Sequence, residues 1–449
     1  MLLNQLTKFE FGTKLSTLVS PARPIQSIEH LNGRTIELDR IEKALFAQGR
    51  HIFIYGDRGV GKSSLAAAAA NQCQSSDATY IDVSCSPDST LKSTVINIAY
   101  KAINASRVRK TKNITNTSIE FKFFKIGSTL EITLQDLNAE IHTLSDAVDI
   151  LNEVSLIHSD RPVIVLDEFD RISDPAQRNL FADLVKQLGD KKINITFIFT
   201  GVGSSLDDLL GAHPSAIRQF ETIELKKLSW TARWNIALQA VNAFDLELEQ
   251  NICTRIAAVS DGYPYYVHLI TEKLLWRIFE DSDVITNISW DHYHSALNDA
   301  IESISAELSR PYEMAVSQRK EEFEEILWAT ADSEYLDRNL RDMFGSYSYI
   351  MKKRTGRDVL NYEEFTVIVR KLKSKTCGEI LIPSKFDRRG WVSFKENVLR
   401  GYVRMQAESQ GVELVGEPQE EHKLKRNVSS STKYYSSSVP SGVFQGRRR

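Results

Sequence analysis

The stretch that decides the fold is Gly56-Asp57-Arg58-Gly59-Val60-Gly61-Lys62-Ser63, which has the form GxxxxGK[ST]. It follows residues 51–55, a run of β-branched and aromatic side chains, and it precedes residues 62–72, which are rich in alanine. These compositions predict a strand, a glycine loop and a helix. Glycines let such a loop place successive amide N–H groups around phosphate oxygens at a helix N-terminus. The stretch therefore predicts a nucleotide-binding site.

The loop suggests a role for each of its residues. We expect Lys62 to reach the β- and γ-phosphates and Ser63 to offer a hydroxyl to Mg²⁺, a cation that prefers oxygen ligands. The other residues expected to bind the nucleotide here are Gly56, Asp57, Arg58, Gly59, Val60, Gly61 and Ser64. ATP and Mg²⁺ are the ligands that this arrangement predicts.

A second segment, Val163-Ile164-Val165-Leu166-Asp167-Glu168, is an apolar strand that ends in two carboxylates. Alone, such a segment is more often a strand that ends in a solvated acidic turn. Combined with the glycine loop, it predicts that Asp167 holds Mg²⁺ through water and that Glu168 orients and polarises the attacking water. We therefore expect a Mg²⁺-dependent ATPase, with slow hydrolysis.

Two further residues have weaker support as catalytic groups. Thr200 ends a predicted strand, where its side chain could sense the γ-phosphate or position water; the alternative is ordinary turn chemistry at Thr200-Gly201. Arg218 precedes the last predicted strand and could reach the phosphate of a neighbouring subunit; the alternative is an exposed arginine in a surface loop.

The rest of the first half alternates strands with helices. This order predicts an α/β fold, with a largely parallel sheet covered on both faces in three αβα layers. The strands are expected at 51–55, 79–84, 163–166, 195–200 and 222–225, and the helices include 144–158 and 177–188. Residues 118–134 interrupt the pattern as a predicted β-hairpin, which either shields the sheet edge or contacts a partner or substrate.

The second half is predominantly helical. Residues 230–305 predict a small helical lid with one strong break at Gly262-Tyr263-Pro264. Residues 323–413 predict helices followed by strands at 379–382 and 391–394, an order typical of a winged helix. The resulting domains are a lead-in at 1–45, a nucleotide core at 46–228, a lid at 229–305, a winged helix at 306–415 and a disordered basic tail at 416–449.

Composition limits the remaining function classes. The chain has 449 residues, 42% of them hydrophobic and 26% charged, with a net charge of -3, which is ordinary for a globular protein without overall attraction to nucleic acid. No apolar run is long enough to span a bilayer, and no secretory leader is evident. The four cysteines are dispersed, which argues against a disulfide framework or a zinc site. We expect a cytoplasmic protein that does not enter a membrane.

Several of these motifs together resemble a known family. Gly33-Arg34-Thr35-Ile36-Glu37, the glycine loop, Asp167-Glu168, Thr200, Arg218 and Gly262-Tyr263-Pro264 look like the motifs of AAA+ and STAND-type ATPases, especially the origin-initiator-like, archaeal-type branch with a C-terminal winged helix. The resemblance implies hydrolysis coupled to assembly or to a conformational switch.

The same resemblance extends the list of site residues. It implies that Gly33 and Arg34 lie near the adenine and that Pro264 brings the lid onto the nucleotide. Residues 262–268 contain no arginine, whereas many AAA+ lids supply one there. This departure favours the STAND pattern and argues against a ring-forming motor.

The sequence leaves open whether the ATPase acts on a protein or on DNA. Residues 341–405 contain 15 Lys and Arg against 7 Asp and Glu, including Arg370 and Lys371 at a helix end and Lys385, Arg388 and Arg389 in the presumed wing. Such positions can contact a nucleic-acid backbone, or they can form the solvated face of a protein-binding winged helix. The readings are a regulatory ATPase acting on an oligomer or partner protein, and an ATP-dependent DNA-binding protein of initiator or transposition-regulator type. A metabolic P-loop kinase is less favoured, because no acceptor site is evident.

Overall fold

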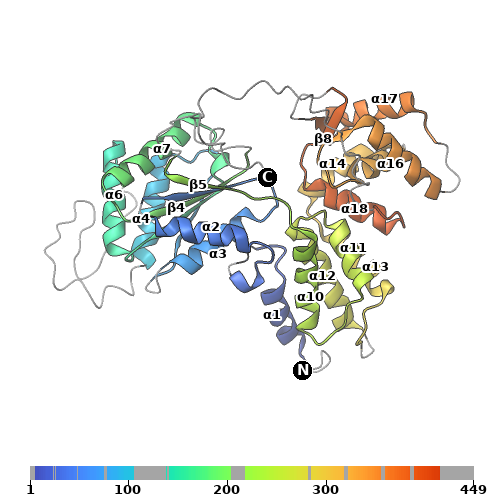
Figure 1. Cartoon of the computed structure of the whole chain (residues 1–449), viewed down its shortest axis with the longest axis horizontal. Helices are drawn as coiled ribbons and strands as arrows, with labels where there is room; N and C mark the ends of the chain where they lie inside the picture. Colours follow the sequence, from blue (N-terminus) through green and yellow to red (C-terminus); the bar gives the residue numbers. More distant parts are fainter. Residues whose placement is uncertain are drawn as a thin grey trace, which may run out of the picture.

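The computed structural model describes residues 6–23, 25, 27–47, 49–74, 78–105, 138, 141–203, 218–281, 285–317, 322–354, 359–384 and 389–414. The predicted hairpin at 118–134 and tail at 416–449 lie outside these residues, as do Lys385 and Arg388. Figure 1 shows a sheet with helices on both sides, a group of helices beside it, and a further helical group that carries a small sheet. Within the described ranges, no helix is long and apolar enough to cross a membrane.

The central sheet has five parallel strands in the order β2-β3-β4-β1-β5. Its strands are β1 (His51–Tyr55), β2 (Ile81–Ser84), β3 (Val163–Asp167), β4 (Thr196–Gly201) and β5 (Phe220–Glu224). Each predicted strand is present within a few residues of its expected bounds. In a parallel sheet the carboxyl ends of all strands meet at one edge, and here that edge receives the glycine loop after β1 and Asp167 at the end of β3.

Alternate residues of each strand face opposite layers of helices. Ile52 and Ile54 belong to the core shared with the helices α2 and α3, whereas Phe53 and Phe199 belong to the core shared with α4, α6 and α7. The bounds of these helices are α2 (Thr35–Phe46), α3 (Lys62–Cys73), α4 (Leu91–Ala105), α6 (Leu144–Ile157) and α7 (Pro175–Asp190), with short 3₁₀ helices η2 (Ile28–His30) and η5 (Phe169–Arg171). The predicted three-layer αβα fold is confirmed (Figure 1).

The helical lid follows β5 and also receives the start of the chain. It consists of α10 (Trp230–Asn242), α11 (Gln250–Val259), α12 (Pro264–Glu280) and α13 (Trp290–Ser303). The first helix, α1 (Lys8–Leu18), packs on α12 through Phe11, whose ring stacks on Phe279 at a centroid distance of 4.2 Å and meets Trp276 edge-on at 4.8 Å. The N-terminal residues therefore join the lid in space (Figure 1).

The C-terminal unit, residues 306–414, combines helices with a three-stranded antiparallel sheet in the order β6-β8-β7. Its elements are α14 (Ala306–Val316), α15 (Glu322–Ala331), β6 (Arg338–Asn339), α16 (Leu340–Lys353), α17 (Tyr362–Leu372), η6 (Lys375–Cys377), β7 (Leu381–Pro383), β8 (Trp391–Phe394) and α18 (Leu399–Ser409). The strands expected at 379–382 and 391–394 are present as β7 and β8. The last helix, α18, packs back against α11 and α13 of the lid.

Candidate functional site

The glycine loop adopts backbone angles that other residues rarely reach. Gly56, Gly59 and Gly61 have φ values of 147°, 85° and 96°, and Gly61 is the N-cap of α3. A Cβ on Gly56 would lie 2.4 Å from the carbonyl oxygen of Leu225 at the end of β5. Glycine is therefore required both by the conformation of the loop and by its close approach to the sheet.

Lys62 is held inside the loop that it follows. Its Nζ donates hydrogen bonds to the carbonyl oxygens of Gly56 at 3.0 Å and Asp57 at 2.8 Å, and the residue is only 9% exposed. Burial lowers the pKa of the Lys62 ammonium, while the charges of Asp170 and Asp167 act in the opposite direction. A phosphate in the loop would offer this partly desolvated cation a better partner than two neutral carbonyls.

The predicted metal ligands meet at the carboxylate of Asp167. Ser63 donates from Oγ to Asp167 Oδ1 at 3.0 Å, and the Thr200 hydroxyl donates to the same oxygen. The backbone N–H of Glu168 donates to both Asp167 Oδ1 and Thr200 Oγ1, each at 3.1 Å. A carboxylate and a hydroxyl side by side form an all-oxygen donor set, which suits Mg²⁺ that keeps its waters and binds phosphate. The geometry therefore fits the cation that the sequence predicted.

Glu168 occupies a less common backbone conformation beside this carboxylate. Its φ of 55° places it in the left-handed region, where a non-glycine residue is uncommon. Its Oε2 accepts a hydrogen bond from Arg171 Nη1 at 2.7 Å, so the carboxylate is engaged by the following 3₁₀ turn. To act on a water at the phosphate, Glu168 would have to exchange this partner.

A cavity of about 730 Å³ lies over the loop and is lined by four parts of the chain. The core contributes the loop, Asp167, Glu168 and Thr200, and the segment before α2 contributes Ser20 to Arg23 and Ile25. The lid contributes Pro264, Tyr265 and His268, and the C-terminal unit contributes Glu307 and Glu396. Pro264 lies close to the loop, with Cγ 3.6 Å from the position that a Cβ on Gly61 would take, and its contact with the nucleotide stays a prediction.

Two residues that were predicted to lie near the adenine are absent from the cavity lining. Arg34 donates from Nη2 to the carbonyl oxygens of Val60 at 2.9 Å and Lys226 at 2.8 Å, so its guanidinium supports the loop from behind. Gly33 has a φ of 72°, and a Cβ there would lie 2.4 Å from Ala232 Cβ in the lid. Neither residue lines the cavity, and their adenine contact stays a prediction.

Arg218 is exposed at the start of β5, at the edge of the sheet opposite the glycine loop. Five residues of strand, roughly 3.3 Å each, separate it from the loop edge. From there its side chain does not reach its own chain's site, so a role on phosphate would require a second subunit.

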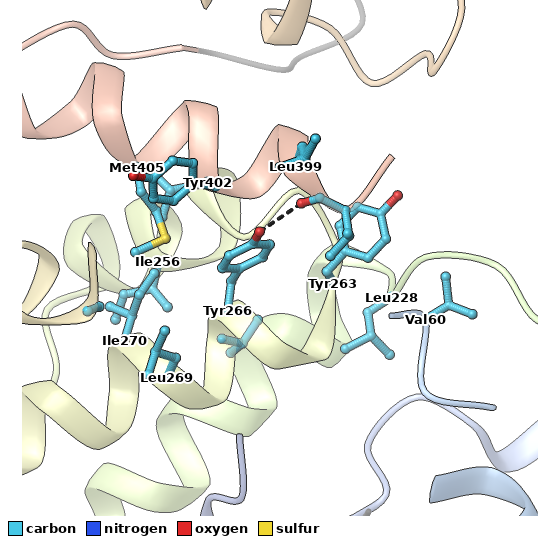
Figure 2. Close-up of a cluster of buried hydrophobic side chains, with 14 of the residues drawn as sticks. Val60, Leu228, Ile256, Tyr263, Tyr266, Leu269, Ile270, Leu399, Tyr402 and Met405 are labelled. Atoms are coloured by element: carbon cyan, nitrogen blue, oxygen red, sulfur yellow. Dashed lines mark hydrogen bonds between the residues drawn. The ribbon is translucent and has the colours of Figure 1, made fainter. Parts of the chain in front are cut away.

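The C-terminal unit contacts the glycine loop directly. Asn397 donates from Nδ2 to Asp57 Oδ2 at 3.0 Å, and a Cβ on Gly59 would lie 3.1 Å from Val398 Cγ2. Figure 2 shows the adjoining apolar contact, in which Tyr266 of the lid packs beneath α18 and donates its hydroxyl hydrogen bond to the backbone oxygen of Val398 at 2.8 Å. The loop, lid and C-terminal unit thus share one continuous contact surface.

A buried charge cluster lies behind that surface. The carboxylate of Asp261, between α11 and α12, forms ion pairs with Lys227 at 3.2 Å, Arg400 at 3.1 Å and Arg404 at 3.4 Å. Burial opposes ionisation of Asp261, but the arginines and Lys227 outweigh it and hold the pKa of the carboxyl below its usual value. Burial also lowers the pKa of Lys227 to about 8. We call these four residues the Asp261 cluster; it joins the core–lid connection, the lid and α18.

Sequence patterns missed several residues of the site. The segment before α2, His268, Glu307 and Glu396 line the cavity without belonging to a recognisable motif. The position of His268 one helical turn after Pro264 could have indicated it, because residues four apart share a helix face. Nothing in the local sequence of Glu396 or Asn397 connects them with a loop more than 330 residues earlier.

Residues 30–198 match the family described as AAA ATPase domain, in agreement with the resemblance that the motifs indicated. Curated proteins gave no match. Among solved structures, a Walker-type ATPase of Pyrococcus abyssi has 16% identity and a TM-score of 0.48 over 85% of this chain and 99% of its own. Cdc6p from Pyrobaculum aerophilum has 15% identity and a TM-score of 0.43 over 87% and 98%. The Orc1 protein of Aeropyrum pernix, solved in complex with DNA, has 12% identity and a TM-score of 0.40 over 84% and 93%.

Proposed function

We propose that this chain is an ATP-binding, Mg²⁺-dependent AAA+ ATPase of STAND type that works as a nucleotide-controlled switch. The observation that carries the proposal is that one cavity is built jointly by the glycine loop, the lid and the C-terminal unit. A ligand in that cavity therefore has different contacts when the C-terminal unit is docked and when it is displaced. Such a difference in contacts is what allows a ligand to shift a conformational equilibrium.

The roles within the site follow from its contacts. Ser63 and Asp167 would hold Mg²⁺, which supplies charge neutralisation for the phosphates when bound. Lys62 would exchange the carbonyls of Gly56 and Asp57 for phosphate oxygens. Thr200 orients the Asp167 carboxylate, and Glu168 would position the attacking water after leaving Arg171.

The switch depends on charges that the C-terminal unit brings to the cavity. Glu307 and Glu396 line it together with Asp167, Glu168 and Asp170. An added γ-phosphate brings more negative charge beside these carboxylates, which share the lining with Arg23, Arg58, Lys62 and Arg171, and like charges at short range repel. We therefore infer that ATP weakens the docking of the C-terminal unit more than ADP does.

Hydrogen–deuterium exchange of the full chain tests the switch. With a non-hydrolysable ATP analogue, the peptide covering residues 395–404 should exchange faster than with ADP, because its contacts with the loop are weakened. Asn397→Ala should raise exchange there without nucleotide, whereas the exposed control Asn251→Ala should not. Equal exchange with both nucleotides, in protein shown to bind them, would contradict the switch.

A second candidate function is DNA binding by the C-terminal unit. Its helix–strand–helix–helix–strand–strand order supports a winged helix, and α17 ends in the basic residues Arg370 and Lys371, next to Lys373. Phosphate contacts by such residues make affinity fall steeply with salt. Binding of duplex DNA at two salt concentrations, with and without ATP, tests the reading, and Arg388→Ala with Arg389→Ala should weaken it. If duplex DNA shows no salt-dependent binding, a protein becomes the favoured partner of the C-terminal unit.

Self-association is proposed through Arg218. Its exposed position far from its own loop supports a role only at a neighbouring subunit's phosphate. The mass in solution with ADP and with a non-hydrolysable ATP analogue should differ, and Arg218→Ala should lower ATP cleavage without affecting ATP binding. A single mass at every concentration and in both nucleotide states would speak against this role.

A further inference from the structure

His268 is a buried polar side chain that the proposed chemistry does not use. It lies on α12 one turn after Pro264, lines the cavity over the glycine loop, and is 2% exposed. Neither its Nδ1 nor its Nε2 has a hydrogen-bond partner within the part of the chain that the structure describes. Because buried polar atoms are nearly always paired in folded proteins, an imidazole left unpaired beside a ligand cavity calls for an explanation.

Two successive serines at the start of α3 line the cavity and have different partners. Ser63 donates to Asp167 Oδ1 at 3.0 Å. Ser64 Oγ accepts from the backbone N–H of Ile25 at 3.1 Å. Phosphates on the loop with Mg²⁺ at Asp167 would leave the rest of a nucleotide to extend toward Ile25.

The cavity also offers apolar surface to a flat group. Its lining includes Pro21, Ala22, Ile25, Pro264 and Tyr265, together with the polar Ser20 and Arg23. The volume of about 730 Å³ exceeds what a chain of phosphates needs. Ligand pockets of this kind combine apolar walls with a few polar groups that set orientation. The polar side chains that the lid supplies to the cavity are Tyr265 and His268, of which His268 is the buried one.

Resting on the proposed nucleotide site, we infer that His268 hydrogen-bonds the base of the bound nucleotide. The ligand class is a purine that carries an amino group and ring nitrogens, since one nitrogen of a neutral imidazole can either accept from the amino group or donate to a ring nitrogen. His268 is thereby a specificity-determining residue on the lid, and base binding ties α12 to the glycine loop.

The ionisation of His268 agrees with a base contact and not with a phosphate contact. Burial, assisted by the charge of His30, lowers the pKa of His268 to about 4. The imidazole is therefore neutral at pH 7 and provides no cationic anchor for a phosphate. A neutral donor–acceptor group is instead typical of base recognition.

The test compares ligands with and without a base on four full-length proteins in the presence of Mg²⁺. The wild type, His268→Leu and His268→Gln are titrated with ADP and with inorganic tripolyphosphate, and the melting temperature of each is measured without ligand. Thr271→Val is the matched control, because Thr271 lies on the same helix, is fully buried with an unpaired hydroxyl, and does not line the cavity.

We expect His268→Leu to weaken ADP binding by about tenfold or more, the effect of one lost hydrogen bond and an unpaired base group. Tripolyphosphate binding should be unchanged, and the melting temperature without ligand should be equal or higher, because an unpaired buried polar group has been removed. His268→Gln should recover much of the affinity, and Thr271→Val should bind ADP like the wild type.

Three results would overturn the inference: unchanged ADP affinity in His268→Leu, parallel loss of ADP and tripolyphosphate binding, or a lowered melting temperature without ligand. Each would assign His268 to packing alone. A wild type that binds tripolyphosphate and ADP equally well would also overturn it, while leaving the phosphate site intact. A wild type that binds neither ligand would instead refute the proposed function itself.

Discussion

The nucleotide site and the Asp261 cluster both gather charged side chains, yet they are built in opposite ways. At the nucleotide site, Lys62, Asp167 and Glu168 come from short motifs at the strand ends and line an open cavity, to which the C-terminal unit adds Glu307 and Glu396. In the Asp261 cluster, four charges come from three separate segments; Asp261 and the α18 residues Arg400 and Arg404 are buried, and Lys227 is partly buried. The charges at the nucleotide site can interact with a ligand, whereas the charges of the Asp261 cluster interact with one another inside the protein. The difference separates a site for chemistry from a joint between structural units.

Of the two regions, the Asp261 cluster should contribute more to the free energy of unfolding. Asp261→Asn leaves Lys227, Arg400 and Arg404 buried without their counter-ion, and removing one partner of a buried ion pair costs about 3–5 kcal/mol. Denaturant unfolding measures this loss. Asp299→Asn, which breaks the more exposed pair with Arg277, is the matched control and should cost at most about 1 kcal/mol. Equal losses in the two variants would remove the distinction between the joint and a surface pair.

Changes at the nucleotide site should have the larger effect on the rate of ATP cleavage. Glu168→Gln keeps the shape of the side chain but removes the charge that would polarise water, so single-turnover ATP cleavage should fall about 100-fold, or about 2.7 kcal/mol. ATP affinity and the free energy of unfolding should stay near wild type. Arg171→Ala, which releases Glu168 from its ion pair, should not slow cleavage. Cleavage by Glu168→Gln at the wild-type rate would show that its assigned role is wrong.

Binding should depend on the loop cation. Lys62→Ala removes the ammonium that would contact the phosphates, and ATP affinity should fall about 50-fold, or about 2.3 kcal/mol, by equilibrium titration. The free energy of unfolding should not fall by a comparable amount, because the buried ammonium loses only hydrogen bonds to neutral carbonyls. Unchanged ATP affinity would contradict the placement of phosphates at this loop.

His51 is a third kind of charged-group environment, because it is a buried titratable side chain that belongs neither to the nucleotide site nor to the Asp261 cluster. His51 Nδ1 accepts a hydrogen bond from the backbone N–H of Phe197 at 3.0 Å, and burial lowers its pKa to about 3. Unfolding restores the ordinary pKa near 6.5, so the stability from neutral His51 is complete above that pH and is lost as pH falls toward 3.

Between pH 7 and pH 5 this linkage should cost about 2 kcal/mol of unfolding free energy. His51→Gln keeps an acceptor for Phe197 but does not titrate, so denaturant unfolding of this variant should show that much less loss over the same range. Identical pH dependence in both proteins would mean that His51 is not kept neutral by the fold.

Much of the nucleotide core was predictable because its decisive interactions are local. The glycine loop between β1 and α3 and the carboxylates after β3 follow from residue types at fixed spacing. The parallel sheet then brings Ser63, Asp167 and Thr200 together, because carboxyl ends of parallel strands share one edge. The placement of Arg34 was less accessible, since its guanidinium binds Val60 and Lys226 through backbone oxygens, which any sequence provides.

The sequence alone determined the glycine loop, its companion carboxylates and the order of strands and helices, because these depend on backbone freedom, periodicity and short-range chemistry. Only the tertiary structure decided that Asn397 and Val398 contact that loop, that His268 lines its cavity, and that Asp261 joins Lys227 to α18. Such contacts join residues tens to hundreds of positions apart. They arise from how apolar faces pack, and no local pattern along the chain encodes them.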